Sequence, residues 1–129
     1  MLIERTEYRD LETAAGVLEK KNVFRHCQFS GFSFEGGHID AAFLGCTFTR
    51  LDWYWGVFKE CLFVESRFVK CIFRGTAFPG CKFVECQFVD CEFVEDDQGK
   101  ACSALGAHVY ATLNKGCKGG EFLFAKAAL

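Results

Sequence analysis

The sequence predicts an all-β solenoid in which the chain turns a corner every five residues. Every fifth residue from Phe43 to Phe93 is aromatic, which makes eleven consecutive positions. Two positions before most of these stands a small residue, as in CKFVECQFVDCEFVE at residues 81–95. A strand buries alternate residues and a helix every third or fourth, so this period fits neither. Four corners close a square coil of about twenty residues, and coils stack at the ~4.8 Å spacing of neighbouring strands.

The repeats cover residues 22–95. A second run, in a register one residue different, supplies the large residues Phe24, Phe29, Phe34 and Ile39. The two runs make fifteen repeats with one residue missing before Phe43. We therefore expect about four coils, with the large residues stacked along the centre and the small ones on the inner wall.

Residues 22–95 resemble the pentapeptide-repeat family in these two features, the large central residue and the small residue two positions earlier. The resemblance implies a right-handed quadrilateral β-helix. It constrains function less, because the repeat describes the interior of the fold and recognition depends on the outward residues.

Both ends of a solenoid expose unpaired strand edges and therefore need a cap. Within residues 1–21 we expect a short helical cap, because the apolar residues are at helical spacing: Leu11, Ala14, Ala15 and Leu18. Residues 96–129 are interpreted as a C-terminal capping or dimerisation segment. Its first part predicts a helix that stops at Asn114 to Gly116, with one apolar face: Ala101, Leu105, Val109 and Leu113.

The C-terminal tail is short and apolar, and two interpretations of it stay open. It packs onto the last coil of its own chain, or it pairs with a second copy to form a homodimer. The residues that would make the dimer contacts are Phe122, Leu123, Phe124 and Leu129.

Seven of the nine cysteines occupy the small inward position of the repeat. We interpret them as compact, buried hydrophobic residues with free thiols. The twenty-residue period stacks three pairs: Cys61 with Cys81, Cys71 with Cys91, and Cys27 with Cys46. A stack holds Cβ atoms ~4.8 Å apart, which exceeds the ~3.5–4.5 Å of a disulfide, so we expect reduced thiols and no zinc site. Cys102 and Cys117, outside the repeats, are expected to be the most accessible.

Composition excludes several functions. The 129 residues suffice for one domain, and a net charge of −2 gives no basic surface for direct nucleic-acid binding. We expect no membrane segment, no signal peptide and a cytoplasmic location. His26, His38 and His108 lie far apart in the sequence, and no other residues form a catalytic or cofactor-binding pattern. We therefore expect a protein that is not an enzyme and has no cofactor.

Recognition must then depend on outward residues, and one face is suited to it. Tyr54 and Trp55 fall in outward positions, with Gly36 and Gly75 expected on either side of Trp55. Arg74 is expected beside Tyr54 as a cation–π partner. The residues predicted to contact a protein partner of unknown identity are Tyr54, Trp55, Ile72, Arg74 and Val94. The alternative is that a terminal segment of the same chain covers the two aromatic residues.

The sequence therefore favours a rigid protein-binding module, for instance the immunity half of a bacterial toxin pair. The alternative follows from the family resemblance, because the best-known members mimic DNA, bind DNA gyrase or topoisomerase and protect them from quinolones or toxins. That role requires strongly acidic faces, whereas residues 23–93 contain eight acidic and seven basic residues.

Overall fold

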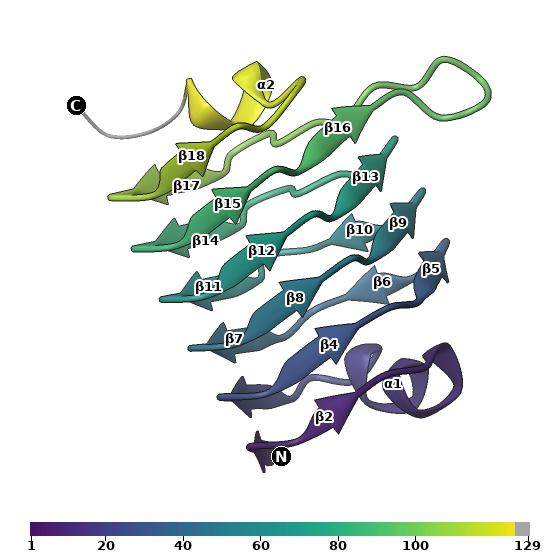
Figure 1. Ribbon diagram of the computed structural model, residues 1–129, viewed down its shortest axis with the longest axis vertical. Helices are drawn as coiled ribbons and strands as arrows, with labels where there is room; N and C mark the ends of the chain where they lie inside the picture. Colours follow the sequence, from purple (N-terminus) through teal and green to yellow (C-terminus); the bar gives the residue numbers. More distant parts are fainter. Residues whose placement is uncertain (126–129) are drawn as a thin grey trace.

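The computed structural model describes residues 1–125, which form parallel strands wound into about five square turns. The strands line up into flat sheets along the stack, with a short helix near each end (Figure 1). The predicted all-β solenoid with helical caps is confirmed, although it has about one turn more than expected. Neither described helix has the length and apolar character that crossing a membrane requires.

Two of the four sheets contain six parallel strands each. In order along the stack, sheet A consists of β1 (Leu2–Glu4), β3 (Val23–Arg25), β7 (Ala42–Leu44), β11 (Leu62–Val64), β14 (Lys82–Val84) and β17 (His108–Tyr110). Sheet B consists of β2 (Glu7–Tyr8), β4 (Gln28–Ser30), β8 (Thr47–Thr49), β12 (Arg67–Val69), β15 (Gln87–Val89) and β18 (Leu113–Lys115).

The other two sheets are shorter. Sheet C consists of β5 (Ser33–Glu35), β9 (Asp52–Tyr54), β13 (Ile72–Arg74) and β16 (Glu92–Val94). Sheet D pairs β6 (His38–Ile39) with β10 (Val57–Phe58), and single bridges at Ala77 and Ser103 extend it.

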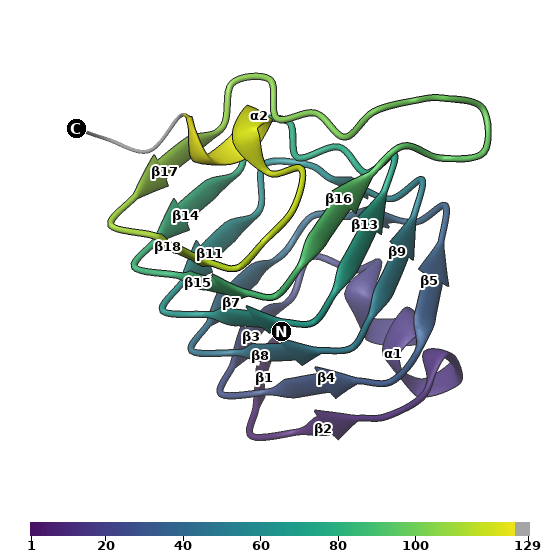
Figure 2. The same ribbon diagram turned by 45° about the horizontal axis from the view of Figure 1, so that its top comes forward.

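Residues 1–21 contain part of a turn as well as the expected helix. Ile3 pairs with Phe24 and Tyr8 with Phe29, so β-pairing begins before residue 22. α1 (Leu11–Leu18) then takes the place of further strands and lies at this end of the shaft, next to β5 (Figure 2). The Asp10 side chain caps the helix by accepting a hydrogen bond of 2.9 Å from the backbone N–H of Thr13.

The helix expected over residues 101–113 is wrong. This segment instead forms β17 and β18, which add another turn to sheets A and B. The residues in register with the Phe of the preceding turn are Ala104, Val109, Asn114 and Gly119. The five-residue period therefore continues after a longer connection, but without the large residues by which it could be recognised.

α2 (Glu121–Phe124) follows and covers the end of the stack above β18 and β16 (Figure 2). Leu123 is completely buried, and the ring of Phe124 meets those of Phe88 and Phe93 edge to face at 5.3 and 5.9 Å. Large side chains from α2 thus occupy the centre of a turn whose own inward residues are small.

Aromatic rings fill the shaft in stacked columns. In one of them the centroids of Phe43, Phe63 and Phe83 lie 5.1 and 4.8 Å apart, with the planes within 9° of parallel. Rings of neighbouring sheets meet edge to face, as Phe63 and Phe68 do at 5.4 Å. The repeated Phe therefore makes both of the ring geometries that aromatic pairs prefer.

Most corners have a residue in the left-handed backbone conformation, two positions after the central residue. Arg50 (φ 53°) and Glu65 (φ 50°) are examples, and glycine occupies other corners. A residue with a side chain costs roughly 1–2 kcal/mol in this conformation. Side chains at corners are therefore kept at a cost to folding.

Candidate binding surfaces

All nine cysteines are free thiols, and their contacts show more than a small volume. Each Sγ lies within hydrogen-bonding distance of a carbonyl oxygen in the adjacent turn. Cys71 Sγ, for example, donates to the carbonyl of Phe48 at 3.3 Å, and Cys86 Sγ to that of Phe63 at 3.3 Å. Ser66, in the same small position, donates its hydroxyl to the Phe43 carbonyl at 3.2 Å. The small residue thus adds a side-chain hydrogen bond to a carbonyl of the strand ladder. The Ile39 carbonyl, for example, accepts from the Cys61 thiol at 3.2 Å and from the backbone N–H of Lys59 at 2.8 Å.

Burial makes these thiols weak acids. It raises the pKa of Cys46 to about 12 and that of Cys86 to about 11. Hydrogen bonding to the stacked Cys61 thiol, together with burial, raises the pKa of Cys81 far above its usual value. Even Cys117, which is only partly buried, has a pKa raised to about 11, mainly by burial. The thiols of Cys46, Cys86 and Cys117 are protonated at neutral pH and are therefore poor nucleophiles.

The residues predicted for partner contact lie together on sheet C and its corner. Trp55 is 39% exposed, and its ring meets that of Tyr54 edge to face at 4.6 Å. Ile72 pairs in register with Asp52, and Val94 with Arg74, so both lie on the same sheet. Both are half-buried.

Trp55 has the backbone conformation of a corner, with φ 58°. The strand register places Gly36 and Gly75 at the same corner in the turns on either side, as the sequence predicts. A bulky aromatic residue with a positive φ is an outlier. The sequence therefore accepts backbone strain to keep an indole at this half-exposed position.

Arg74 lies beside Tyr54 in the strand register, but its charged group pairs elsewhere. Its Nε–H donates to Oδ1 of Asp52 at 3.1 Å, across two neighbouring strands. Both side chains are about one-third exposed, so the ion pair adds little to stability. The pairing with Asp52 instead orients the Arg74 guanidinium on the sheet that carries the aromatic pair.

The connection between β16 and the last turn lies against the aromatic pair. Asp97 lines a hollow of about 250 Å³ together with Glu35, Tyr54 and Trp55. The neighbouring Asp97 carboxylate raises the pKa of the Tyr54 phenol. Asp96 lies over Gly75, where an added Cβ would come within 2.9 Å of its Oδ2. A segment of the same chain thus covers part of Tyr54 and leaves Trp55 more exposed.

The residues proposed for dimer contacts are placed at the end of their own stack. Leu123 is buried there, and Phe122 and Phe124 are half-buried against Phe93. Leu129 lies outside the described residues. The dimer stays a prediction. Among these described residues, only Phe122 and Phe124 are exposed enough to contact a second copy without rearrangement.

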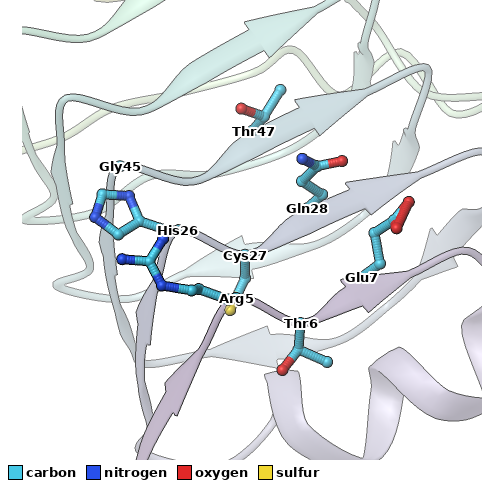
Figure 3. Close-up of a pocket in the computed structure, with 8 residues that line it drawn as sticks. All are labelled: Arg5, Thr6, Glu7, His26, Cys27, Gln28, Gly45 and Thr47. Atoms are coloured by element: carbon cyan, nitrogen blue, oxygen red, sulfur yellow. The ribbon is translucent and has the colours of Figure 1, made fainter.

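A hollow of about 440 Å³ at the corner between sheets A and B was not anticipated from the sequence (Figure 3). Arg5 and His26 occupy successive corner positions there, and the His26 ring lies over Gly45, where a Cβ would come within 2.7 Å of Nδ1. Glu7 is paired with Arg9 at 2.7 Å. The Cys27 thiol donates to the Ile3 carbonyl at 3.4 Å. The hollow is shallow and mostly polar, and the one thiol that lines it is hydrogen-bonded to the backbone.

Within residues 1–125, the structure brings together no group of three or more His, Cys, Asp or Glu side chains that could hold a metal ion.

Square coils that stack a Phe at every fifth residue define the pentapeptide-repeat fold. The chain has this fold, and the resemblance predicted from the sequence is confirmed at that level. No protein-family model and no curated protein sequence matches the chain.

Two solved structures of QnrB1, a plasmid-mediated fluoroquinolone resistance protein, are similar to it. A trypsin-treated variant superposes with a TM-score of 0.60 at 16% identity, covering 86% of this chain and 51% of that one. Full-length QnrB1 superposes with a TM-score of 0.62 at 12% identity, covering 92% and 70%. The chain therefore spans about half the length of the first of these proteins. At such identities the likeness shows a shared fold.

Proposed function

We propose that the protein is a non-enzymatic binding module that recognises a protein partner through Tyr54, Trp55 and the neighbouring residues of sheet C. The observation that carries the proposal is the half-exposed Trp55 in a left-handed corner. The left-handed conformation is shared by other corners of this fold, so what distinguishes Trp55 is a half-exposed indole where the adjacent turns carry glycine. Tryptophan, tyrosine and arginine are also the residues most enriched at interface hot spots.

The proposed role is to bind and neutralise its partner, as the immunity half of a bacterial toxin pair does. A rigid solenoid loses little conformational entropy on binding, which favours tight association. The oriented Arg74 supplies a charged contact beside the aromatic pair. We further propose that the encounter takes place in the cytoplasm, where free thiols stay reduced.

The test is capture of partners from the native lysate with immobilised protein. The double variant Trp55→Ala, Arg74→Ala is expected to keep the fold and lose capture, because both anchors are removed. The matched control is Arg67→Ala, Val69→Ala on sheet B, which removes a cation and an apolar side chain from the neighbouring face. If the wild type and the double variant retain the same protein equally strongly, sheet C is not the surface that binds it.

A second candidate is the quinolone-protection role that the family resemblance implies. The similarity to QnrB1 favours it, because that protein confers fluoroquinolone resistance. The near balance of acidic and basic residues in the repeats argues against a DNA-like surface. Supercoiling by DNA gyrase, with and without a quinolone, decides between the candidates. Protection or inhibition at micromolar protein would support the second candidate, and the absence of both would dispose of it.

A further inference from the structure

The outer surface of sheet A is largely apolar over the four adjacent strands β3, β7, β11 and β14. Two of the eight outward residues there are Arg25 and Lys82. The other six are aliphatic and are called the apolar strip: Val23, Ala42, Leu44, Leu62, Val64 and Val84. Val23 is 37% exposed and the others are half-buried. Register places Ala42 beside Leu62 and Leu44 beside Val64, so the strip is continuous across the strands.

The corresponding surface of the neighbouring sheet B is mixed in character. On sheet B, the strands β8, β12 and β15 turn outward Thr47, Thr49, Arg67, Val69, Gln87 and Val89. Four of these six residues are polar or charged and two are valine, whereas six of the eight outward residues on the four strands of sheet A are aliphatic. Strand propensity favours β-branched residues on both faces, so it does not explain the leucines and the continuity of sheet A.

The dimensions of the strip limit what can cover it. Four strands at ~4.8 Å spacing and three residues at ~3.3 Å each give roughly 10 Å by 20 Å with side chains. A stable homodimer buries about 800 Å² per partner, which is several times the area of this strip. One α-helix is about 10–12 Å across and spans 20 Å with ~13 residues. A single helix lying along the solenoid axis therefore matches the strip in size, whereas the strip is too small for a second flat sheet.

Charges along the long edges indicate the kind of helix. Glu60 lies at the corner before sheet A, and Glu65 and Glu85 lie at the corner after it. Among the ion pairs of residues 1–125, none involves these three carboxylates. Two cations border the strip: Lys82 beside Leu62, and Arg25 beside Leu44, whose guanidinium is paired with Glu4. Basic side chains flanking the apolar face of a helix would thus meet free carboxylates on both sides.

A hollow at one of these edges has room for such a side chain. It measures about 440 Å³ and is lined by Glu60, Leu62 and Lys82 beside Cys61 and Gly80. Gly80 keeps it open, since an added Cβ would come within 3.1 Å of Cγ of Glu60. The aliphatic stem of a lysine or arginine could pack on Leu62 with its charge at Glu60.

We propose that the apolar strip of sheet A binds an amphipathic α-helix of a protein partner, with Lys or Arg on both sides of its apolar face. This surface is separate from Tyr54 and Trp55, so it can be tested independently of the function proposed above.

The probe is a fluorescein-labelled synthetic peptide of about fifteen residues, with Leu at helical spacing and Lys on both flanks. Anisotropy measured during titration with the protein is expected to show saturable binding. A peptide with Glu in place of every Lys, and a scrambled peptide of the same composition, are each expected to bind at least about tenfold more weakly. Absence of binding up to about 100 µM protein, or equal binding of all three peptides, would overturn the proposal.

Two variants at the same repeat position locate the site. Val64→Lys, at the centre of the strip, is expected to weaken binding at least about tenfold, whereas Val69→Lys on sheet B should change it less than about twofold. If Val64→Lys does not fold, Glu65→Lys with Glu85→Lys serves instead and should abolish the preference for the basic peptide. Equal affinities of Val64→Lys and Val69→Lys would contradict the assignment. So would a wild-type dimer that Val64→Lys dissociates, because the occupant would then be a second copy. Trp55→Gly should bind the peptide like wild type.

Discussion

Cys86 stands between Ser66 and Thr112 at the same position of successive turns. All three side chains point a donor at a carbonyl, and all three are small. The sequence alone identified the small volume but not the donor, because cysteine is read first as a hydrophobic residue. Serine and threonine in the same column were the signal that a donor is required there.

We expect Cys86→Ser to unfold at a higher denaturant concentration than Cys86→Ala. Serine keeps a donor for the Phe63 carbonyl, whereas alanine removes this side-chain hydrogen bond, which contributes about 0.5–1.5 kcal/mol. Urea unfolding followed by circular dichroism measures the difference. If the alanine variant is as stable as the serine variant, the thiol serves only to fill space.

The raised pKa values of the buried thiols predict the response to alkaline pH. In the unfolded chain a thiol ionises near pH 8.5, whereas the folded protein holds Cys46 protonated until about pH 12. The unfolded state therefore loses protons first, and stability falls as the pH rises between these values. Below that range the contribution is fully present. Urea midpoints at pH 7.5 and pH 10 test this expectation, and an unchanged or higher midpoint at pH 10 would contradict it.

At the scale of elements, the period of five predicted the repeats but not the ends. The first turn offers only two positions of the period, Ile3 and Tyr8, too few to recognise. The last turn has no aromatic residue at its inward positions and follows a longer connection. Its core comes from α2, and that contact between distant segments has no local signal in the sequence.

The packing of α2 onto the last turn makes a specific prediction. Leu123→Ala is expected to lower the free energy of unfolding by about 2–5 kcal/mol, because the side chain is completely buried. The matched control is Leu113→Ala in β18, whose side chain is 52% exposed and should change stability by less than about 0.5 kcal/mol. Thermal unfolding of the two variants compares them. Similar losses in both would mean that α2 is not part of the folded core.

For the whole molecule, interior and surface follow different rules. The interior could be predicted almost residue by residue, because each Phe and each small residue has a fixed place in the coil. The surface could be predicted only as a set of positions. The register placed Trp55 between two glycines, yet the pairing of Arg74 with Asp52 and the approach of Asp97 depend on side-chain choices that no period specifies.

The central claim is that Trp55 is kept at its corner for recognition, at a cost to the fold. The most direct test is the free energy of unfolding of Trp55→Gly, compared with Glu65→Gly at another left-handed corner. Relief of the backbone strain should stabilise both variants by about 1 kcal/mol. A Trp55→Gly variant that is clearly less stable than wild type, while Glu65→Gly is more stable, would contradict the account, because Trp55 would then serve folding.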